Sequence, residues 1–296
     1  MSNIVQILSG IFRIVSAMRQ HDLARQRPFL AMFRFAKVQI LTRLLGTPLL
    51  VPFVNGTGIY TCAGRTGANG NYYLGLHECA DMAFTLHYLR PKDIFVDVGA
   101  NIGSYTLLAS GGVGATSISF EPVPETLTRL HSNLEANHLS HMVDVRPVCL
   151  GCRDGTVSFT TDADTINHIV ESAEPDTSHT IEVPIRRLDN QIADVPVLIK
   201  IDAESFDDEV LAGSDRLLCG EGPMALLIET VGEQTRKRLS ELRFKPCSYD
   251  PFSRKISEYD ARRPGANNYL FIRDVAYAQA RVLSAPHFDL HGFGFI

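Results

Sequence analysis

The sequence lacks several features that would assign it to common protein classes. Its six cysteines are scattered over 296 residues, too sparsely for a disulfide framework, which favours a reducing compartment. Lys and Arg number 28 against 33 Asp and Glu, so the chain lacks the basic excess of a general nucleic-acid binder. There is no internal repeat and no low-complexity tract. The remaining composition is that of an ordinary globular protein.

Two nucleotide-binding motifs are also absent. The turn that carries Gly99, Asn101 and Gly103 does not have the Gly-x-Gly-x-x-Gly spacing of a dinucleotide fingerprint. No Gly-Lys-Ser/Thr follows it, so it is not a phosphate-binding P-loop. Cys149 and Cys152 form a lone CxxC without a second pair, which argues against a zinc site.

The N-terminal 50 residues are both basic and apolar. They carry seven Lys or Arg and one acid, a charge of +6, so the other 246 residues carry −11. Arg13 and Arg19 interrupt the first apolar run, which excludes the roughly 20 consecutive apolar residues of a spanning helix. Arg13 also lies inside that run rather than before it, unlike the charge of a signal peptide.

Two interpretations of residues 1–50 remain. One is an amphipathic segment that lies on an anionic membrane, and the other is a set of helices packed on the main domain with arginines toward water. We favour packed helices, because any packed helix shows such a stripe. We expect a cytoplasmic protein, with residues 1–50 as the part that could contact the inner face of a membrane.

The chain divides into three predicted parts. Residues 1–50 form a helical extension, residues 51–92 form small β-hairpins (including Tyr72 to Leu74) and a helix, and residues 93–296 form the main domain. In the main domain strands alternate with helices, which predicts a Rossmann-like α/β fold, a mostly parallel sheet with helices on both faces. A β-rich excursion interrupts it at about 150–190. The expected strands are 94–98, 116–120, 142–148, 197–201, 225–228, 244–249 and 269–273, and the expected helices of this domain are 104–110, 124–138, 205–218 and 233–242.

A Gly-rich turn follows the first of these strands. Asp97 lies at the carboxyl end of the strand, where ligands bind in open α/β sheets. Gly99 and Gly103 let the backbone turn sharply and approach a ligand closely. The helix that follows, which contains Thr106, begins with unpaired N–H groups and a positive dipole end. The segment therefore predicts a site for a nucleotide-like ligand, with an ordinary strand-to-helix turn as the alternative.

Acids end two further predicted strands. Glu121, followed by Pro122, comes about 20 residues after the Gly-rich turn, where a carboxylate can accept hydrogen bonds from both ribose hydroxyls. The alternative for Glu121 is an acid that stabilises a helix N-terminus. Asp202 and Glu204 end another strand. Because the carboxyl ends of parallel strands meet at one edge, we expect these acids to lie near Asp97.

Together these segments resemble the FkbM family of S-adenosylmethionine-dependent methyltransferases, over about residues 72–230. The matching segments are Phe95–Gly103, Phe120–Pro122, Leu150–Gly151, Arg187–Asp189, Ile199–Glu204 and Val210–Gly213. Glu78 resembles an acid that the family places before its first sheet strand. Where the family usually has Gly after its Lys-Ile-Asp-x-Glu motif, this chain has Ser205. Residues 1–50 lie outside the resemblance.

The resemblance implies a class I methyltransferase sheet of seven strands, the last ones antiparallel, and S-adenosyl-L-methionine as the cofactor. In that picture Glu121 holds the ribose, and residues near Leu150 border the adenine. The family is associated with O-methylation of sugar and natural-product hydroxyls, so the expected partner is a small-molecule or saccharide acceptor. The residues expected to bind the cofactor are Glu78, Asp97, Gly99, Asn101, Gly103, Thr106, Glu121, Pro122 and Leu150.

O-methylation needs a group that takes the hydroxyl proton, and the candidates are Asp202, Glu204 and His168. We rank Asp202 first, because it lies on the expected active edge. The acids between residues 202 and 208 could also hold Mg²⁺, but acids at a helix start more often cap the helix, so we predict no metal. Two other functions stay open, an NAD-dependent oxidoreductase and a non-catalytic module that binds a membrane or a partner.

Overall fold

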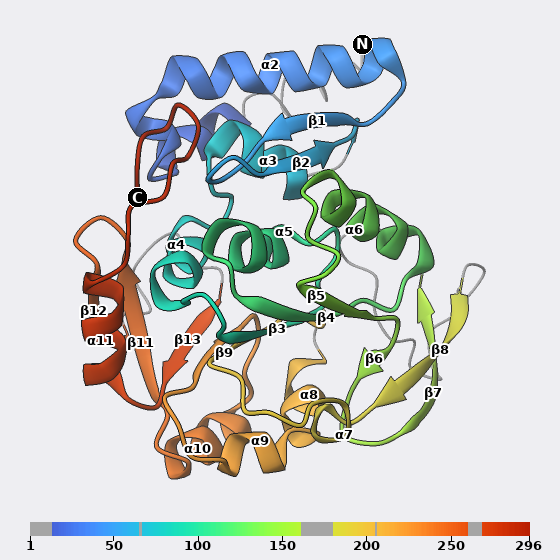
Figure 1. Ribbon diagram of the computed structural model, residues 1–296, viewed down its shortest axis with the longest axis vertical. Helices are drawn as coiled ribbons and strands as arrows, with labels where there is room; N and C mark the ends of the chain where they lie inside the picture. Colours follow the sequence, from blue (N-terminus) through green and yellow to red (C-terminus); the bar gives the residue numbers. More distant parts are fainter. Residues whose placement is uncertain (1–13, 65–66, 161–179, 205, 260–267) are drawn as a thin grey trace.

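The computed structural model describes residues 14–64, 67–160, 180–204, 206–259 and 268–296. At the centre of this described part is a sheet of eight strands (Figure 1). These strands are β3 (Ile94–Val98), β4 (Thr116–Phe120), β5 (Val143–Arg146), β9 (Leu198–Ile201), β10 (Ala225–Ile228), β11 (Lys245–Asp250), β12 (Lys255–Glu258) and β13 (Tyr269–Ile272). Their order is β12-β11-β13-β10-β9-β3-β4-β5, and the five strands from β10 to β5 are parallel. This arrangement confirms the Rossmann-like α/β class.

Helices cover both faces of the sheet, as its strand sequences require. Successive side chains of a strand point to opposite faces, so Phe95 belongs to one hydrophobic core and Val96 to the other. Both faces are apolar, as expected of a parallel sheet buried on both sides. The first core includes side chains of α4 (Cys79–Tyr88), α5 (Ser104–Thr106) with the π-helical η2 (Leu107–Val113), α6 (Pro124–Ala136) and α11 (Val275–Leu283). The second includes side chains of α7 (Leu188–Gln191), α8 (Asp207–Ala212), α9 (Asp215–Cys219) and α10 (Glu233–Glu241).

An N-terminal layer packs beside this domain. It consists of η1 (Ala24–Gln26), α2 (Pro28–Leu45), the antiparallel hairpin of β1 (Leu49–Pro52) and β2 (Gly58–Thr61), and α3 (Gly67–Leu74). Helix α2 ends at Gly46, whose φ of +64° lies in the left-handed region that glycine adopts readily. Arg34 of α2 lies between the rings of Tyr72 and Phe293, which joins the layer to the C-terminal segment. None of the helices in the described ranges is long and apolar enough to cross a bilayer.

A small second sheet stands in the predicted β-rich excursion. It contains β6 (Cys149–Leu150), β7 (Gly155–Thr160) and β8 (Thr180–Arg186), in the order β6-β8-β7. The candidate base His168 lies outside the described residues.

Three details differ from the sequence prediction. The described part of the main sheet has eight strands rather than seven, because a short turn after β11 returns the chain as β12, which has a single buried residue, Ile256. Residues 72–74, predicted as β, belong to α3, which is held by tertiary contacts such as Phe35 against Tyr73. The single helix predicted over 205–218 is divided into α8 and α9 at Gly213 and Ser214.

Candidate active site

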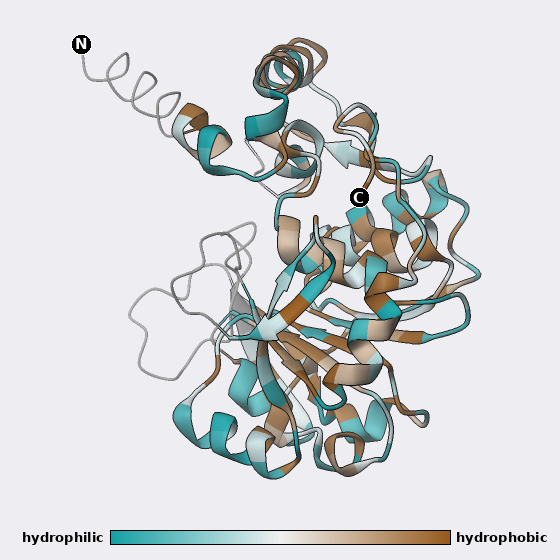
Figure 2. Cartoon of the chain, turned by 90° about the vertical axis from the view of Figure 1, so that its left-hand side faces the viewer, coloured by the Kyte–Doolittle hydropathy of each residue, from teal (hydrophilic) through white to brown (hydrophobic). Residues whose placement is uncertain are grey.

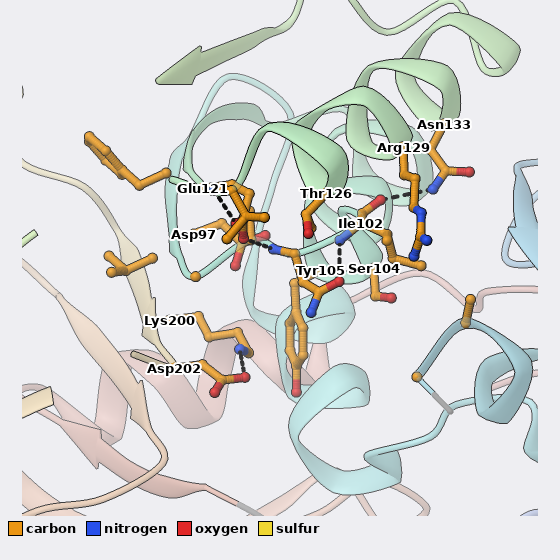
Figure 3. Close-up of a pocket in the computed structure, with 18 of the residues that line it drawn as sticks. Asp97, Ile102, Ser104, Tyr105, Glu121, Thr126, Arg129, Asn133, Lys200 and Asp202 are labelled. Carbon is orange, nitrogen blue, oxygen red and sulfur yellow. Dashed lines mark hydrogen bonds and ion pairs between the residues drawn. The ribbon is translucent and has the colours of Figure 1, made fainter. Parts of the chain in front are cut away.

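A cavity of about 670 Å³ is lined by the carboxyl ends of β3, β4, β9 and β10 (Figure 3). Its volume falls in the range of roughly 300–1,000 Å³ that is usual for small-molecule sites. Asp97, Glu121 and Asp202 line it together, as expected for acids at one edge of a parallel sheet. It is also lined by Tyr60 from the hairpin of the N-terminal layer and by Cys62, which follows that hairpin. The cavity therefore extends from the sheet edge to that layer.

The glycines of the Gly-rich turn have positive φ angles and leave no room for a side chain. Gly99 has a φ of +71°, and a Cβ built there would stand 1.9 Å from the carbonyl oxygen of Asp202. Gly103 has a φ of +88°, and its Cβ would stand 2.4 Å from Cδ1 of Leu130 in α6. A side chain at residue 99 would push the backbone after β9 away from the turn, whereas one at residue 103 would displace the side chain of Leu130. Gly99 lines the cavity, whereas Gly103 is not among the lining residues.

Glu121 is buried at the end of β4, with 6% of its surface exposed. Its Oε2 accepts a hydrogen bond from the amide of Asn101 at 3.0 Å, and its Oε1 accepts one from the amide of Val123 at 2.9 Å. A carboxylate has about four acceptor positions, so two remain for a ligand. Burial raises the pKa of Glu121 to about 7, although the two amides act to lower it.

Asp97 is buried at the end of β3, and only one of its two carboxylate oxygens has a hydrogen-bond partner in the described part of the chain. Its Oδ2 accepts a hydrogen bond from the Thr106 hydroxyl at 2.6 Å, and that hydroxyl lies 2.8 Å from the hydroxyl of Ser119. Its Oδ1 is buried with no hydrogen-bond partner in the described part of the chain. Burial raises the pKa of Asp97, while nearby Lys200 acts to lower it. Thr106 thus positions Asp97 and is not itself among the lining residues.

Lys200, Asp202 and Glu229 form a charged cluster at the ends of β9 and β10. Lys200 Nζ donates to Asp202 Oδ2 at 2.7 Å and lies 4.8 Å from the centre of the Tyr105 ring (Figure 3). Burial acts to lower the pKa of Lys200, but Asp202 and Asp97 raise it above its ordinary value, so the amine stays charged. Burial acts to raise the pKa of Asp202, but the charge and hydrogen bond of Lys200, together with the hydrogen bond from Glu229, outweigh burial and keep that pKa low.

Glu229 donates a hydrogen bond to Asp202 in its protonated form. Partial burial and the charge of Asp202 raise the pKa of Glu229 to about 7. The pair of Asp202 and Glu229 therefore combines one ionised carboxylate with one carboxyl group that titrates near neutrality. Two carboxyl groups in such close contact titrate as a coupled pair.

The other predicted residues line the same cavity. Glu78, at the start of α4, accepts a hydrogen bond from the Tyr105 hydroxyl. Pro122, Leu150 and Glu204 also line the cavity.

Asp207 and Asp208 have a different role from Asp202. Asp207 is fully buried; its Oδ1 accepts from the amide of Ala203 at 2.8 Å and its Oδ2 from the amide of Thr230 at 3.0 Å. Asp208 accepts from the amide of Gly232 at 3.1 Å. These acids hold the loop after β10 in place. Among the described residues, no three His, Cys, Asp or Glu side chains are grouped so as to hold a metal ion.

Sequence reasoning missed Glu229 and Tyr105. Glu229 directly follows the strand 225–228, just as Glu121 follows its own strand, so the same signal identifies it. Tyr105 carries no such signal, because its contacts with Glu78 and Lys200 come from elements far apart in the sequence.

The residues present fit the expected cofactor. S-adenosylmethionine carries a ribose and a charged ammonium group, which need acceptors. Glu121 offers two acceptor positions, and the buried Oδ1 of Asp97 offers another. Apolar Leu150 and Phe206 line the same cavity as Glu121, as an aromatic base requires.

Comparison with known proteins gives a consistent result. Residues 97–239 match the family model described as the methyltransferase FkbM domain. The 31-O-demethyl-FK506 methyltransferase FkbM of Streptomyces tacrolimicus is 29% identical, over 42% of this chain and 60% of that protein. Methyltransferase 1 of Beauveria bassiana is 28% identical over the same shares. A solved structure, methyltransferase FkbM from Methylobacillus flagellatus KT, gives a TM-score of 0.44 at 19% identity, over 64% of this chain and 47% of that chain. The match thus spans about 60% of the length of these curated relatives.

Proposed function

We propose that this chain transfers a methyl group from S-adenosyl-L-methionine to a hydroxyl group of an acceptor molecule, because residues 97–239 match the family model of the FkbM methyltransferase domain. The proposed acceptor is a saccharide or a metabolite resembling a natural product. The family match supports methyl transfer as the reaction class. The observation that carries the proposal is the pair of Asp202 and Glu229 in the cavity, beside the predicted cofactor residues.

The proposed cofactor site uses the sheet edge. When bound, the cofactor supplies an electrophilic methyl group on a positively charged sulfur. Glu121 would accept hydrogen bonds from the ribose hydroxyls, and Asp97 Oδ1 would accept one from the ammonium group. The carboxylates around this part of the cavity favour a cationic ligand electrostatically.

The proposed acceptor site is the part of the cavity toward the N-terminal layer. Asn71 and Ser104 line it, and the Asn71 amide donates to the Ser104 hydroxyl at 3.0 Å. Asn133 and Tyr60 line the same region. Amides and hydroxyls can both donate and accept, which suits an acceptor rich in hydroxyl groups.

In this proposal Glu229 takes the proton of the acceptor hydroxyl, and Asp202 sets the pKa of Glu229. A general base acts best with a pKa near the working pH, and the pKa of Glu229 is about 7. Asp202 remains ionised through its contact with Lys200, so its charge raises the proton affinity of Glu229. This refines the sequence prediction, in which Asp202 itself was ranked first as the base. Holding the reacting groups in line supplies the remaining acceleration.

The proposal is tested by calorimetric titration with S-adenosylhomocysteine and, separately, with NAD. We expect saturable binding of S-adenosylhomocysteine that weakens in Glu121→Ala. Transfer of a radiolabelled methyl group is then measured against a panel of saccharides and alcohols. Binding of NAD instead would assign the oxidoreductase alternative. Binding of S-adenosylhomocysteine without transfer to any hydroxyl acceptor would contradict O-methylation and favour a binding module.

A further inference from the structure

Helix α2 has two apolar faces, and only one of them is covered by the described residues. Ala31 and Val38 face the layer beneath and are buried. On the opposite side four large apolar residues form a row, which we call the α2 stripe. The stripe consists of Phe29, Phe33, Ile40 and Leu44, which are 90%, 65%, 56% and 76% exposed.

The spacing of the stripe places it on one side of the helix. Its members follow one another at intervals of four, seven and four residues, which bring side chains to the same face. Helix α2 lies along one edge of the molecule (Figure 1), and hydrophobic residues are visible on it at the top of Figure 2. With 18 residues it is about 27 Å long. A row of exposed aromatic and aliphatic side chains of this length is unusual for a surface that meets only water.

The charges beside the stripe are of one sign. Lys37 lies on one side of it and Arg43 on the other, and both are exposed. Helix α2 contains no acidic residue. The segment 1–50 as a whole carries +6, whereas the rest of the chain carries −11. An apolar centre with basic flanks is the pattern of a helix that lies in the interface of an anionic membrane.

We propose that the α2 stripe docks this chain on an anionic lipid surface, with Lys37 and Arg43 against the lipid headgroups. The helix need not leave the protein to do so. Its inner face is held by Arg34, which lies between Tyr72 and Phe293 and donates to the carbonyl oxygen of Tyr72 at 3.1 Å. Docking therefore buries the outer face of α2, which is already exposed in the folded chain.

The docked position would hold the cavity near the lipid surface. Pro48, three residues beyond the end of α2, lines the cavity. The proposed acceptor end thus lies next to the docking layer. Lipid binding itself does not depend on the proposed methyl transfer and is measured without an acceptor.

The test is co-sedimentation of the full chain with phosphatidylcholine vesicles, with and without phosphatidylserine. We expect binding only to the anionic vesicles, weaker at high salt because screening reduces the attraction. Phe33→Ser and Ile40→Ser should each weaken binding about tenfold, since each removes a large apolar side chain from the interface. The charge reversal K37E/R43E should weaken it by about 25-fold or more, at about fivefold for each basic charge lost.

Matched variants separate docking from general effects. Leu283→Ser changes an apolar residue that is 59% exposed on another helix, α11, and should bind like the wild type. K237E/K245E makes the same change in net charge away from α2 and should also bind nearly as the wild type does. Equal pelleting of the stripe variants and the wild type would overturn the proposal. A dimer seen by sedimentation without vesicles, and abolished by Phe33→Ser, would instead assign the stripe to contact between two copies of the chain.

Discussion

Asp202 and Asp207 stand five residues apart in the connection after β9, yet they serve opposite purposes. The carboxylate of Asp202 contacts two side chains, Lys200 and Glu229, inside the cavity. The carboxylate of Asp207 instead accepts hydrogen bonds from two backbone amides and from the hydroxyl group of Thr230. Both acids follow the same strand, but Asp207 is fully buried, whereas 31% of the Asp202 side chain is exposed. The difference teaches that the partners of a carboxylate, together with its exposure, indicate whether it is available for chemistry.

The largest expected effect comes from the cavity pair. Glu229→Gln and Asp202→Asn should each lower turnover about 10²–10⁴-fold, the usual contribution of a positioned base. The affinity for S-adenosylhomocysteine should stay within a few-fold, because neither carboxyl group is assigned to the cofactor. Steady-state rates and calorimetry measure the two quantities. The double variant should cost little more than one single variant, since residues that act as a unit are not additive.

The pH profile distinguishes a base from a merely structural acid. In the wild type, turnover should rise with pH through about 7, because Glu229 must lose its proton before it can accept another. Glu229→Gln should lose that rise. Asp207→Asn should keep it, with turnover close to that of the wild type in the folded protein. An unchanged profile in Glu229→Gln would remove this residue from the proton transfer.

The next effect concerns the backbone that positions Asp202. Gly99→Ala places a Cβ 1.9 Å from the Asp202 carbonyl oxygen, at a φ of +71°. Gly114→Ala is the matched control, because Gly114 has a φ of +88° but nothing nearer than 3.9 Å. The control should lose about 1–2 kcal/mol of unfolding free energy for its backbone conformation alone. Gly99→Ala should lose about 1–3 kcal/mol more. Urea denaturation measures both, and equal losses would show that the contact with Asp202 is not tight.

A smaller effect, on stability, is expected when Asp207 rather than the backbone around Asp202 is changed. Asp207→Asn leaves one of two partly buried amides, those of Ala203 and Thr230, facing an NH₂ group. That should cost about 1–3 kcal/mol of stability, the usual loss for an unsatisfied buried donor. Asp208→Asn should cost less, because Asp208 is exposed and water can replace it. Thermal melts of the two variants check this order. The reverse order would contradict the proposal that Asp207 holds the loop after β10 in place.

The sequence predicted the framework of the domain well, for physical reasons. Strands 94–98 and 225–228 were predicted to the residue, because they are short apolar runs buried on both faces. The position of the acids at one edge of the sheet was also predictable, because the carboxyl ends of parallel strands lie at the same edge. Helix α3 was missed, because its Gly- and Asn-rich sequence has low helix propensity and contacts with other elements hold it.

Within the site, the kinds of residue were predictable and their partners were not. The pattern indicated acids at residues 97, 121 and 202, and all of them line one cavity. The difference between Asp202 and Asp207 depends on Glu229 and Thr230, which lie on the loop after another strand. No local pattern contains that information, because it arises only when β9 and β10 pair in register.

The smallest predicted effect extends the comparison to Glu121, a carboxylate that has partners of both kinds. Its oxygens accept hydrogen bonds from two backbone amides, as those of Asp207 do. Its side chain nevertheless lines the cavity, as that of Asp202 does. Its pKa in the free protein is about 7, and ribose hydroxyls donate more strongly to the ionised form than to the protonated one. Ligand binding should therefore lower that pKa and release a proton.

Below pH 7 the affinity for S-adenosylhomocysteine should fall, by about tenfold for each pH unit, because the site must first lose its proton. Calorimetry at pH 6 and pH 8, in buffers of different ionisation enthalpy, measures both the affinity and the proton release. Glu121→Ala should bind more weakly with little dependence on pH. A wild-type affinity that is flat between pH 6 and 8 would show that Glu121, like Asp207, serves only the backbone.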